Sequence, residues 1–295
     1  MRVLITGGNG MLGQKLVLRM QAAGYDLRLL VREGEKVFLK TPADILTGDL
    51  LNKASLRAAT REIETVIHLA GLTHTNNQEM YYLINTLGTK NLLEACQEAQ
   101  VKKFIFISSR AAGLSGGAYA KSKFLAEEEV IKSGLNWVIL RLAEVYGAAE
   151  SEAISKLIRI IKSNYLIPII GFGQFRLAPI FLDDALEGIL EVLKNPAINK
   201  KNYNLAGPEE ITYNELVNQI LKEAGLKRIK IFLPVILVKI ILDMFSLMGI
   251  DAFVKDQLPR LLSDKSSDIS LAVKDFNFQP RNFSTGLKEI LNFKD

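Results

Sequence analysis

The sequence predicts an α/β fold, namely a doubly wound parallel sheet followed by a smaller, mostly helical C-terminal lobe. Three observations predict it. Short, uniformly apolar runs alternate with longer helical patterns through the first half, which is typical of parallel strands covered by helices on both faces. A glycine-rich turn follows the first apolar run. After Gly147 the alternation stops, which marks a second lobe.

The first half of the chain contains six strand patterns and three helix patterns. Strands are expected at residues 2–6, 27–31, 44–46, 66–69, 104–107 and 137–140, and helices at residues 11–24, 81–98 and 119–133. Parallel strands need crossover connections, and such crossovers are right-handed. The helices are therefore expected to cover both faces of one sheet.

The second half is less regular. It predicts helices at 151–163 and 183–193, strands at 179–182 and 203–205, and a loop at 168–173. Thr212 precedes a further helix with Glu215 three residues later, the pattern of a capping box. From Lys230 onward we expect helices and loops. The predicted domains are 1–147, completed by about 175–193, and a lobe made of 148–174 and 199–295.

The composition describes an ordinary globular chain and excludes several classes of function. Of 295 residues, 48% are hydrophobic and 23% charged. The net charge of +5 is spread along the chain, so no nucleic-acid partner is expected. One cysteine and two histidines leave no disulfide and no metal site. Cys96 falls within a helix pattern and is expected in the core, and the reducing cytoplasm fits best.

The most apolar segment is 231–250. Lys239 and Asp243 interrupt it, so it lacks the roughly 20 consecutive apolar residues of a membrane span. A buried or subunit-facing helix is the favoured interpretation, and a helix lying on a membrane surface is the alternative. The apolar run after Met1 and Arg2 is too short for a secretory leader, so none is expected.

The glycine-rich turn is the strongest motif. It reads Thr6-Gly7-Gly8-Asn9-Gly10-Met11-Leu12-Gly13, after a predicted strand and before a predicted helix. Its spaced glycines permit a sharp turn, close approach of a pyrophosphate, and tight helix–strand packing. The helix N-terminus offers N–H groups to phosphate. We therefore expect a Rossmann dinucleotide site, in which the cofactor contacts Thr6, Gly7, Gly10, Met11, Leu12 and Gly13.

The end of the second strand indicates which nicotinamide cofactor binds. An acid there binds the ribose 2′-hydroxyl of NAD, whereas a nearby arginine accommodates the 2′-phosphate of NADP. Val31 stands where the acid is expected, and Arg32 follows it. A guanidinium grips phosphate in a bidentate way, so NADP(H) is favoured over NAD(H). In the alternative, Arg32 is a solvated loop charge and Glu33 contacts the ribose.

Tyr119 and Lys123 are the candidate catalytic pair. They are four residues apart at the start of a predicted helix, so they share one face. An ammonium beside a phenol lowers the pKa of the tyrosine, which makes Tyr119 a plausible acid and base. Ser108 and Ser109 come just after the fifth strand, and the carboxyl ends of parallel strands border the crevice in which ligands bind.

These motifs together resemble the extended or atypical short-chain dehydrogenases/reductases of the NAD(P)-dependent epimerase/dehydratase superfamily. The resemblance covers nearly the whole chain. Besides the motifs above it rests on Gly48-Asp49-Leu50, residues 66–71, Val145-Tyr146-Gly147, and residues 179–184 and 204–208. It implies a sugar-nucleotide epimerase-like oxidoreductase or isomerase, and it extends to the branch of the complex I NADPH-binding accessory subunit.

The resemblance also implies residue roles. Asp49 would contact the adenine amine with Leu50 beside it, and Ala70 and Gly71 would line the dinucleotide. Ser109, the second of the pair, would orient the substrate oxygen. Tyr119 would transfer the proton and Lys123 would hold the nicotinamide ribose. Asn85 matches a family position, whereas His68 is expected to be a satisfied core histidine and no metal ligand is implied.

Three departures from the family pattern bear on the reaction. Arg141-Leu142 stands in place of an Arg-Pro pair, and the stretch from Ser109 to Tyr119 is short. Arg110-Ala111 stands where sugar dehydratases carry Asp-Glu, which argues against water elimination. Arg176 is a candidate for binding a substrate diphosphate. The alternative is a surface arginine, or one that pairs with Asp183 or Asp184.

Three functions remain open. The first is an NADP(H)-dependent oxidoreductase or epimerase acting on a secondary alcohol or ketone, above all a nucleotide sugar. The second is a non-catalytic NADPH-binding module, against which Ser109, Tyr119 and Lys123 argue. The third is a steroid- or flavonoid-type reductase. If residues 232–248 are exposed the third is favoured, and if they are buried, the first. The resemblance also allows a homodimer through the helices at 81–98 and 119–133.

Overall fold

The computed structural model describes residues 1–35, 43–147, 153–247, 257–263 and 265–292. The chain divides into two compact units. Unit 1 comprises Met1–Arg141 and Gly188–Tyr203, and unit 2 comprises Leu142–Glu187 and Asn204–Asp295. Unit 1 contains the glycine-rich turn, and unit 2 contains the apolar segment that begins at Ile231.

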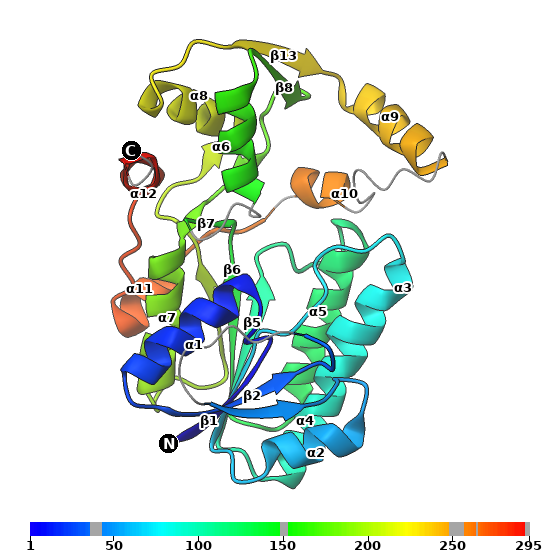
Figure 1. Ribbon diagram of the computed structural model, residues 1–295, viewed down its shortest axis with the longest axis vertical. Coiled ribbons are helices and arrows are strands. Elements are labelled where there is room, and N and C mark those ends of the chain that lie inside the picture. The colour runs from blue at the N-terminus through cyan, green and yellow to red at the C-terminus, as the bar shows by residue number, and fades with distance from the viewer. Residues whose placement is uncertain (36–42, 148–152, 248–256, 264, 293–295) are drawn as a thin grey trace. The chain divides into compact units, whose positions relative to one another are not determined.

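Unit 1 is built on a seven-stranded sheet of order β11-β6-β5-β4-β1-β2-β3 (Figure 1). The strands are β1 (Arg2–Thr6), β2 (Asp26–Val31), β3 (Asp44–Thr47), β4 (Thr65–His68), β5 (Lys103–Ser109), β6 (Trp137–Leu142) and β11 (Lys201–Leu205). β1 pairs in parallel with both β2 and β4. The strand order therefore reverses between β1 and β4, which is where doubly wound folds bind ligands.

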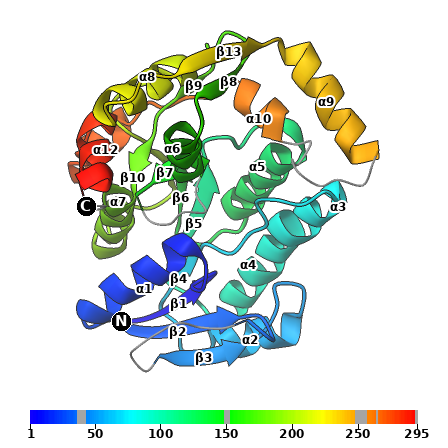
Figure 2. The same cartoon turned by 45° about the horizontal axis from the view of Figure 1, so that its top comes forward.

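Helices cover both faces of this sheet. α2 (Lys53–Thr60), α4 (Gly88–Glu98) and α5 (Gly117–Lys132) lie over one face, and α1 (Met11–Ala22) lies over the other (Figure 2). α3 (Gln78–Tyr81) and the π-helix η1 (Tyr82–Leu87) lead into α4. The predicted doubly wound α/β fold is confirmed.

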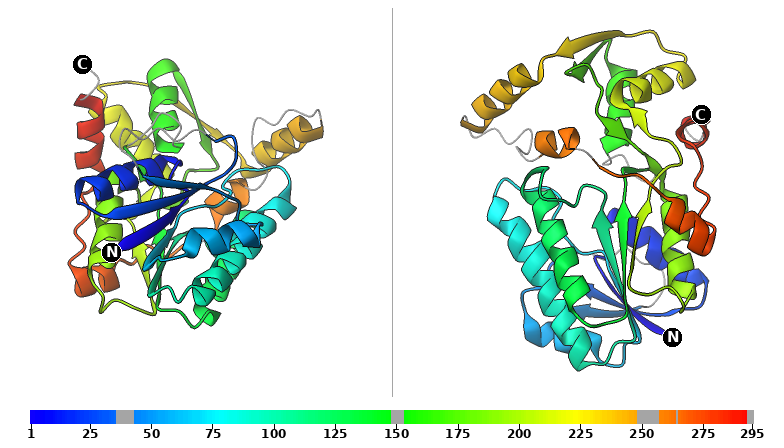
Figure 3. Two further views of the ribbon diagram at one scale, coloured as in Figure 1. Left: turned by 60° about the horizontal axis from the view of Figure 1, so that its bottom comes forward. Right: turned by 180° about the vertical axis from the view of Figure 1, so that it is seen from behind.

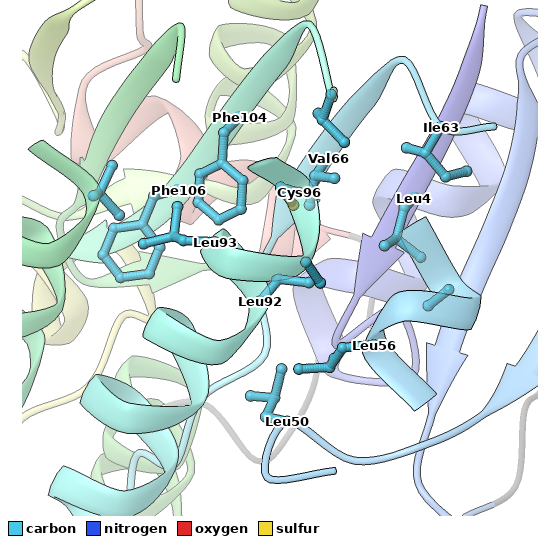
Figure 4. Close-up of a cluster of buried hydrophobic side chains, with 14 of the residues drawn as sticks. Leu4, Leu50, Leu56, Ile63, Val66, Leu92, Leu93, Cys96, Phe104 and Phe106 are labelled. Atoms are coloured by element: carbon cyan, nitrogen blue, oxygen red, sulfur yellow. The ribbon is translucent and has the colours of Figure 1, made fainter. Parts of the chain in front are cut away.

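The core of unit 1 lies between the sheet and these helices. Figure 4 shows Leu4, Val66 and Phe104 of the strands facing Leu92 and Cys96 of α4. All five are fully buried. Burial raises the pKa of the Cys96 thiol far above its ordinary value, so Cys96 is the inert core cysteine that the sequence predicts.

Unit 2 combines short sheets with helices. Its strand pairs are β7 (Val145–Tyr146) with β10 (Ile180–Phe181), β9 (Arg176–Leu177) with β12 (Ile211–Thr212), and β8 (Leu166–Ile170) with β13 (Ile229–Leu233). Its helices are α6 (Ala153–Ser163), α7 (Leu182–Lys194, which continues into unit 1), α8 (Tyr213–Glu223), α9 (Val235–Leu247), α10 (Gln257–Leu262), α11 (Ser270–Phe276) and α12 (Phe283–Asn292).

Several sequence expectations for these elements were wrong. The expected loop at 168–173 begins inside β8, because Pro168 and Ile169 pair with Ile231 and Phe232 of β13. β13 itself lies where helices and loops were expected. α2 was not predicted, although Asn52 caps it through hydrogen bonds from Ala54 and Ser55. The predicted capping box of Thr212 and Glu215 is present.

The favoured interpretation of residues 231–250 was a buried or subunit-facing helix. Burial within the chain is wrong for the described residues, whereas the subunit-facing alternative stays a prediction. Residues 231–233 belong to β13, and only α9 is helical. From Val235 to Met244 no described side chain of α9 is buried, and Ile236 is 71% exposed. Across the described parts of the chain, no helix combines the length and the apolar character that crossing a bilayer requires.

Candidate active site

The glycine-rich turn joins β1 to α1 at the switch point. Gly7 has a φ of 74°, and a Cβ atom there would lie 2.6 Å from the backbone nitrogen of Ala70. A Cβ atom at Gly13 would lie 2.2 Å from the carbonyl oxygen of Gly7. Neither separation is sterically allowed, so both positions require glycine. The turn therefore packs directly against the loop after β4.

The N-terminus of α1 is open to an anion. Gly10 is the N-cap, has no side chain to cap the helix, and precedes a first turn without acidic residues. The N–H groups of Met11, Leu12 and Gly13 have no partner within the helix. Together with the helix dipole, these donors suit a pyrophosphate.

Arg32 follows β2, and its side chain is 66% exposed. Its guanidinium donates a hydrogen bond to Glu35, whose other carboxylate oxygen accepts one from the Asn9 side chain of the glycine turn. The acid that contacts the turn is thus Glu35, a residue that the sequence analysis did not consider. In the sequence, only the spacing of three residues between Arg32 and Glu35 indicates that the two could pair.

Asp49 and Leu50 lie between β3 and α2. One carboxylate oxygen of Asp49 accepts a hydrogen bond from the backbone of Leu51 at 2.8 Å. Leu50 is buried, and its carbonyl accepts a bond from Asn91 at 3.0 Å. These bonds fix the loop that carries the carboxylate.

A chain of buried hydrogen bonds connects β1, β4 and the following helices. Thr6 Oγ1 shares a hydrogen bond with His68 Nδ1 at 2.6 Å and accepts one from the backbone of Ala70 at 3.3 Å. His68 Nε2 shares a hydrogen bond with Thr89 at 3.0 Å. Burial and the Lys123 cation lower the pKa of His68 to about 3, so His68 is neutral and satisfied, as the sequence predicts. Thr6 therefore orients β4.

Asn85 holds the loop after β4 from inside η1. Its Oδ1 accepts a bond from the backbone of Leu72 at 2.7 Å, and its Nδ2 donates to the carbonyl of Leu72 and to Ser122, each at 3.0 Å. A Cβ atom at Gly71 would lie 3.1 Å from Asn85 Oδ1 and 3.9 Å from Lys123 Nζ. Gly71, Asn85 and Lys123 are therefore neighbours. The π-helix that places Asn85 leaves no signal in the sequence pattern.

Lys123 is almost completely buried in α5, with 5% of the residue exposed. Its Nζ donates a hydrogen bond to the carbonyl of Ile107 at 2.9 Å and lies 4.2 Å from the centre of the Phe106 ring. Burial lowers the pKa of Lys123 to about 8, against an opposing effect of Glu127. The ammonium is thus held at the end of β5, next to Gly71.

Tyr119 lies in the first turn of α5, one turn before Lys123. Gly116 and Gly117 have φ values of 116° and 89°, which only glycine adopts readily, and they start the helix just before the tyrosine. Tyr119 is 8% exposed and packs edge-on against Tyr81, with ring centres 5.7 Å apart.

Ser109 is the last residue of β5, two residues after Ile107, whose carbonyl binds Lys123. Its Oγ accepts a hydrogen bond from the backbone of Ala111 at 3.1 Å. Ala111 belongs to the apolar cluster that contains Tyr119. The loop after Ser109 therefore folds back over the start of α5, which brings Ser109, Tyr119 and Lys123 to one edge of the sheet.

Glu127 is a buried carboxylate that the sequence analysis missed. It is 2% exposed, accepts a hydrogen bond from Ser108 at 2.5 Å, and binds Arg141 through two nitrogens. This ion pair explains the roles of Ser108 and Arg141, which anchor α5 to β5 and β6. Tyr119, Lys123 and Glu127 are spaced by four, so the sequence already indicates that Glu127 lies on the same helix face as the other two. Within the run Glu127-Glu128-Glu129 this spacing is easily overlooked.

Two arginines complete the set of sequence candidates. Arg110 directly follows Ser109 and is buried, at 4% exposed. Arg176 lies in β9 of unit 2 with its side chain 67% exposed, 3.9 Å from Glu210. The sequence analysis gave pairing with Asp183 or Asp184 as one alternative for Arg176. Asp184 instead pairs with Arg281 at 2.8 Å.

Comparisons with known proteins identify a family and several relatives. Residues 3–206 match the model of the NAD dependent epimerase/dehydratase family. The chain is 25% identical to bovine (Bos taurus) sterol-4-alpha-carboxylate 3-dehydrogenase, decarboxylating, over 79% of this chain and 72% of that protein. It is 27% identical to a ceramide reductase of Caulobacter vibrioides over 79% of this chain and 73% of that protein.

Solved structures show the same fold at lower identity. The structure of MoeE5 in complex with UDP-glucuronic acid and NAD aligns with a TM-score of 0.80 and 21% identity over 100% of both chains. UDP-glucose 4-epimerase of Thermotoga maritima aligns with a TM-score of 0.78 and 19% identity over 99% of each chain. By its fold and by the family match over most of its length, the chain belongs to the NAD dependent epimerase/dehydratase family of enzymes.

Proposed function

We propose that this chain is an NAD(P)-dependent oxidoreductase that interconverts a secondary alcohol and a ketone on an apolar, lipid-like substrate. The observation that carries the chemistry is the buried Lys123 ammonium beside Gly71, one helical turn after Tyr119. Burying a cation is costly, and a bound cofactor together with a reacting phenol nearby would explain why Lys123 is buried.

The residues present fit a dinucleotide. Glycine at positions 7 and 13 lets the turn pack tightly against the loop after β4 and the start of α1, and the α1 N-terminus offers N–H groups to a pyrophosphate. Asp49 and Leu50 would hold the adenine, Ala70 and Gly71 would line the dinucleotide, and Lys123 would hold the nicotinamide ribose. When bound, the nicotinamide supplies or accepts a hydride.

The chain's own residues would handle the proton. Ser109 would hold the substrate oxygen by a hydrogen bond, while Tyr119 Oη takes the hydroxyl proton during oxidation and returns it during reduction. The positive charge of Lys123, one helical turn away, would stabilise the Tyr119 phenolate when the proton leaves. Arg110 and Ala111 supply no carboxyl pair, so water elimination is not part of the proposal.

Unit 2 supports an apolar substrate. Exposure of α9 meets the criterion that separates a steroid-type substrate from a nucleotide sugar. A cavity of about 420 Å³ is lined mainly by apolar residues, among them Phe172, Phe175, Phe232, Val235 and Leu262. The names of two curated relatives, a sterol carboxylate dehydrogenase and a ceramide reductase, indicate lipid substrates.

A nucleotide sugar is the second candidate substrate, and the exposed guanidinium of Arg176 favours it. An exposed arginine can bind a diphosphate in a bidentate way. The bound UDP-glucuronic acid of MoeE5 illustrates this substrate class. If the candidate is right, Arg176→Ala weakens substrate binding and leaves cofactor binding unchanged.

Within the same proposal NADP(H) is preferred. Arg32 follows β2, where a 2′-phosphate would reach it, although Glu35 contacts both Arg32 and Asn9. Binding of a 2′-phosphate would therefore displace the Glu35 carboxylate from Arg32, because the two anions repel each other.

The test is a count of bound cofactor followed by a substrate panel. The purified protein is denatured and the released nicotinamide is identified. Refilled protein is then offered sterol-type and long-chain secondary alcohols and ketones beside UDP-sugars, with the absorbance of reduced nicotinamide as the readout. Turnover of the apolar compounds supports the proposal. Turnover of UDP-sugars alone overturns the substrate class, and cofactor binding without any turnover indicates a non-catalytic module.

A further inference from the structure

The two-stranded sheet of unit 2 has an unusual outer face. In the β8–β13 pair, Ile229 lies beside Leu166 and Ile231 lies beside Pro168. All four are exposed, whereas Ile167 and Ile169 between them are fully buried in the core of unit 2. Side chains alternate between the two faces of a strand. The face turned away from the core is therefore apolar where a solvated sheet would be polar.

α9 continues this apolar surface. Figures 1 and 3 show it following β13 and standing apart from α6 and α8 within unit 2. Ile236, Ile240 and Met244 are spaced by four residues and are 71%, 51% and 57% exposed. Leu237 and Ile241 form the adjacent row, at 41% and 37% exposed. One broad side of the helix is thus exposed and apolar.

The surface also carries exposed aromatic rings and cations. Tyr165, Phe172 and Phe232 are 62%, 77% and 46% exposed. Residues 153–174 and 226–247, which include α6, β8, β13 and α9, contain seven Lys or Arg residues and one acid, Asp243 of α9. These cations are Lys156, Arg159, Lys162, Lys227, Arg228, Lys230 and Lys239.

Hydrogen bonds fix two of these cations along β13, namely Arg228 just before the strand and Lys230 on the face opposite Ile229 and Ile231. The Arg228 guanidinium donates to the carbonyls of Ile161 and Lys162. It thereby ties the start of β13 to the end of α6, which brings Lys162 and Lys227 near Arg228. Lys230 donates to Asn214 and Asn218 of α8 at 2.6 and 2.7 Å. The apolar face thus carries an excess of cations over carboxylates, which complements an anionic lipid surface.

We propose that the surface formed by β8, β13 and α9 docks this protein onto an anionic lipid bilayer. α9 would lie in the plane of the interface, because its 13 residues are too few to cross the hydrocarbon. The exposed isoleucines and aromatic rings would enter the boundary between headgroups and acyl chains, and the cations would contact lipid phosphates. This inference uses the same exposed α9 as the proposed substrate class, and vesicle binding without substrate tests it separately from turnover.

The test is co-sedimentation of the full chain with vesicles in the absence of substrate. Vesicles of phosphatidylcholine alone are compared with an equal mixture of phosphatidylcholine and phosphatidylglycerol. We expect partitioning onto the anionic vesicles to be at least about tenfold stronger and to weaken with salt. A protein that stays in the supernatant with both kinds of vesicle overturns the proposal.

Paired variants locate the surface. Ile236→Glu with Met244→Glu is expected to reduce partitioning at least about tenfold, while circular dichroism shows an intact fold. The matched control is Leu18→Glu with Ile131→Glu, two residues of unit 1 that are 41% and 46% exposed, and it should bind like the unaltered protein. Equal losses in both pairs contradict the assignment. A third outcome also contradicts the proposal: the unaltered protein dimerises as its concentration rises and binds no vesicles, and only the first pair of substitutions abolishes the dimer. The surface would then contact a second copy of this chain.

Discussion

Unit 1 buries polar side chains, whereas unit 2 exposes apolar ones. In unit 1, Thr6, His68, Asn85, Lys123 and Glu127 are each at most 5% exposed and all are hydrogen bonded. In unit 2, five apolar residues of α9 are more than a third exposed. Both arrangements cost folding free energy relative to the usual distribution. We propose that a cofactor and a reacting group account for the first arrangement, and a lipid surface for the second.

The largest expected effect comes from the reacting group of unit 1. Tyr119→Phe removes the hydroxyl that moves the proton and keeps the ring that packs on Tyr81. Turnover should fall by about 10²–10⁴-fold, with cofactor affinity unchanged. Steady-state kinetics and cofactor titration measure the two quantities. The control is Tyr25→Phe, which removes a tyrosine hydroxyl from a residue that follows α1. Near-normal turnover by Tyr119→Phe would refute the proton-transfer role of Tyr119.

Stability separates the two units next. Ile5 of β1 is fully buried and Ile236 of α9 is 71% exposed. Ile5→Ala should lower the free energy of unfolding by about 2–5 kcal/mol. Ile236→Ala should change it by less than about 0.5 kcal/mol. Chemical denaturation measures both. Similar losses for the two variants would mean that α9 is packed in solution, and the contrast between the units would disappear.

Cofactor choice should depend on Arg32. Losing a charge-assisted hydrogen bond to the 2′-phosphate costs about 1.5–3 kcal/mol, so Arg32→Ala should weaken NADPH by roughly 10–100-fold. NADH binding should change little. Fluorescence titration of both cofactors gives the comparison, with Arg61→Ala, an exposed arginine after α2, as the control. Equal losses for NADPH and NADH would remove the argument for a 2′-phosphate contact.

The smallest effect is an alkaline limb in the pH profile. Burial lowers the pKa of Lys123 to about 8. As pH rises through this value the ammonium loses its proton and ceases to favour the Tyr119 anion. kcat/KM should therefore fall, by about tenfold one pH unit above the pKa.

A second lysine tests that assignment. Burial also lowers the pKa of Lys103 to about 8, and its Nζ donates to the carbonyl of Val192. Lys103→Arg should keep the alkaline limb, whereas Lys123→Arg should shift it upward because arginine stays charged. The opposite pattern would assign the limb to Lys103.

The sequence predicted the parts of unit 1 that depend on local pattern. Its first six strands lie within a few residues of their expected places, because each is a continuous apolar run between turn residues. The glycine turn was predictable because strand, turn and helix follow one another directly. The placement of Ser109 at the end of β5 and of Tyr119 and Lys123 along α5 was also predictable, whereas their catalytic roles stay predictions.

Other features depend on contacts between distant segments. Pairing of β8 with β13 joins residues more than 60 positions apart, and Pro168 makes β8 look like a loop. Glu127 can be buried because it pairs with Arg141 of β6. The sequence does not single it out, because the next two residues, Glu128 and Glu129, are also glutamates. The exposure of α9 could not be read from its composition, because a uniformly apolar helix is ordinarily buried.

The most direct test of the central claim follows the hydride and the proton together. The protein and Tyr119→Phe are incubated with reduced cofactor carrying deuterium at C4 and with the ketone that the substrate panel identifies. Mass spectrometry of the product alcohol gives the rate of deuterium transfer. The account predicts one deuterium at the carbinol carbon with the unaltered protein and a rate at least about 100-fold lower with Tyr119→Phe. Product without deuterium, or equal rates for the two proteins, would contradict it.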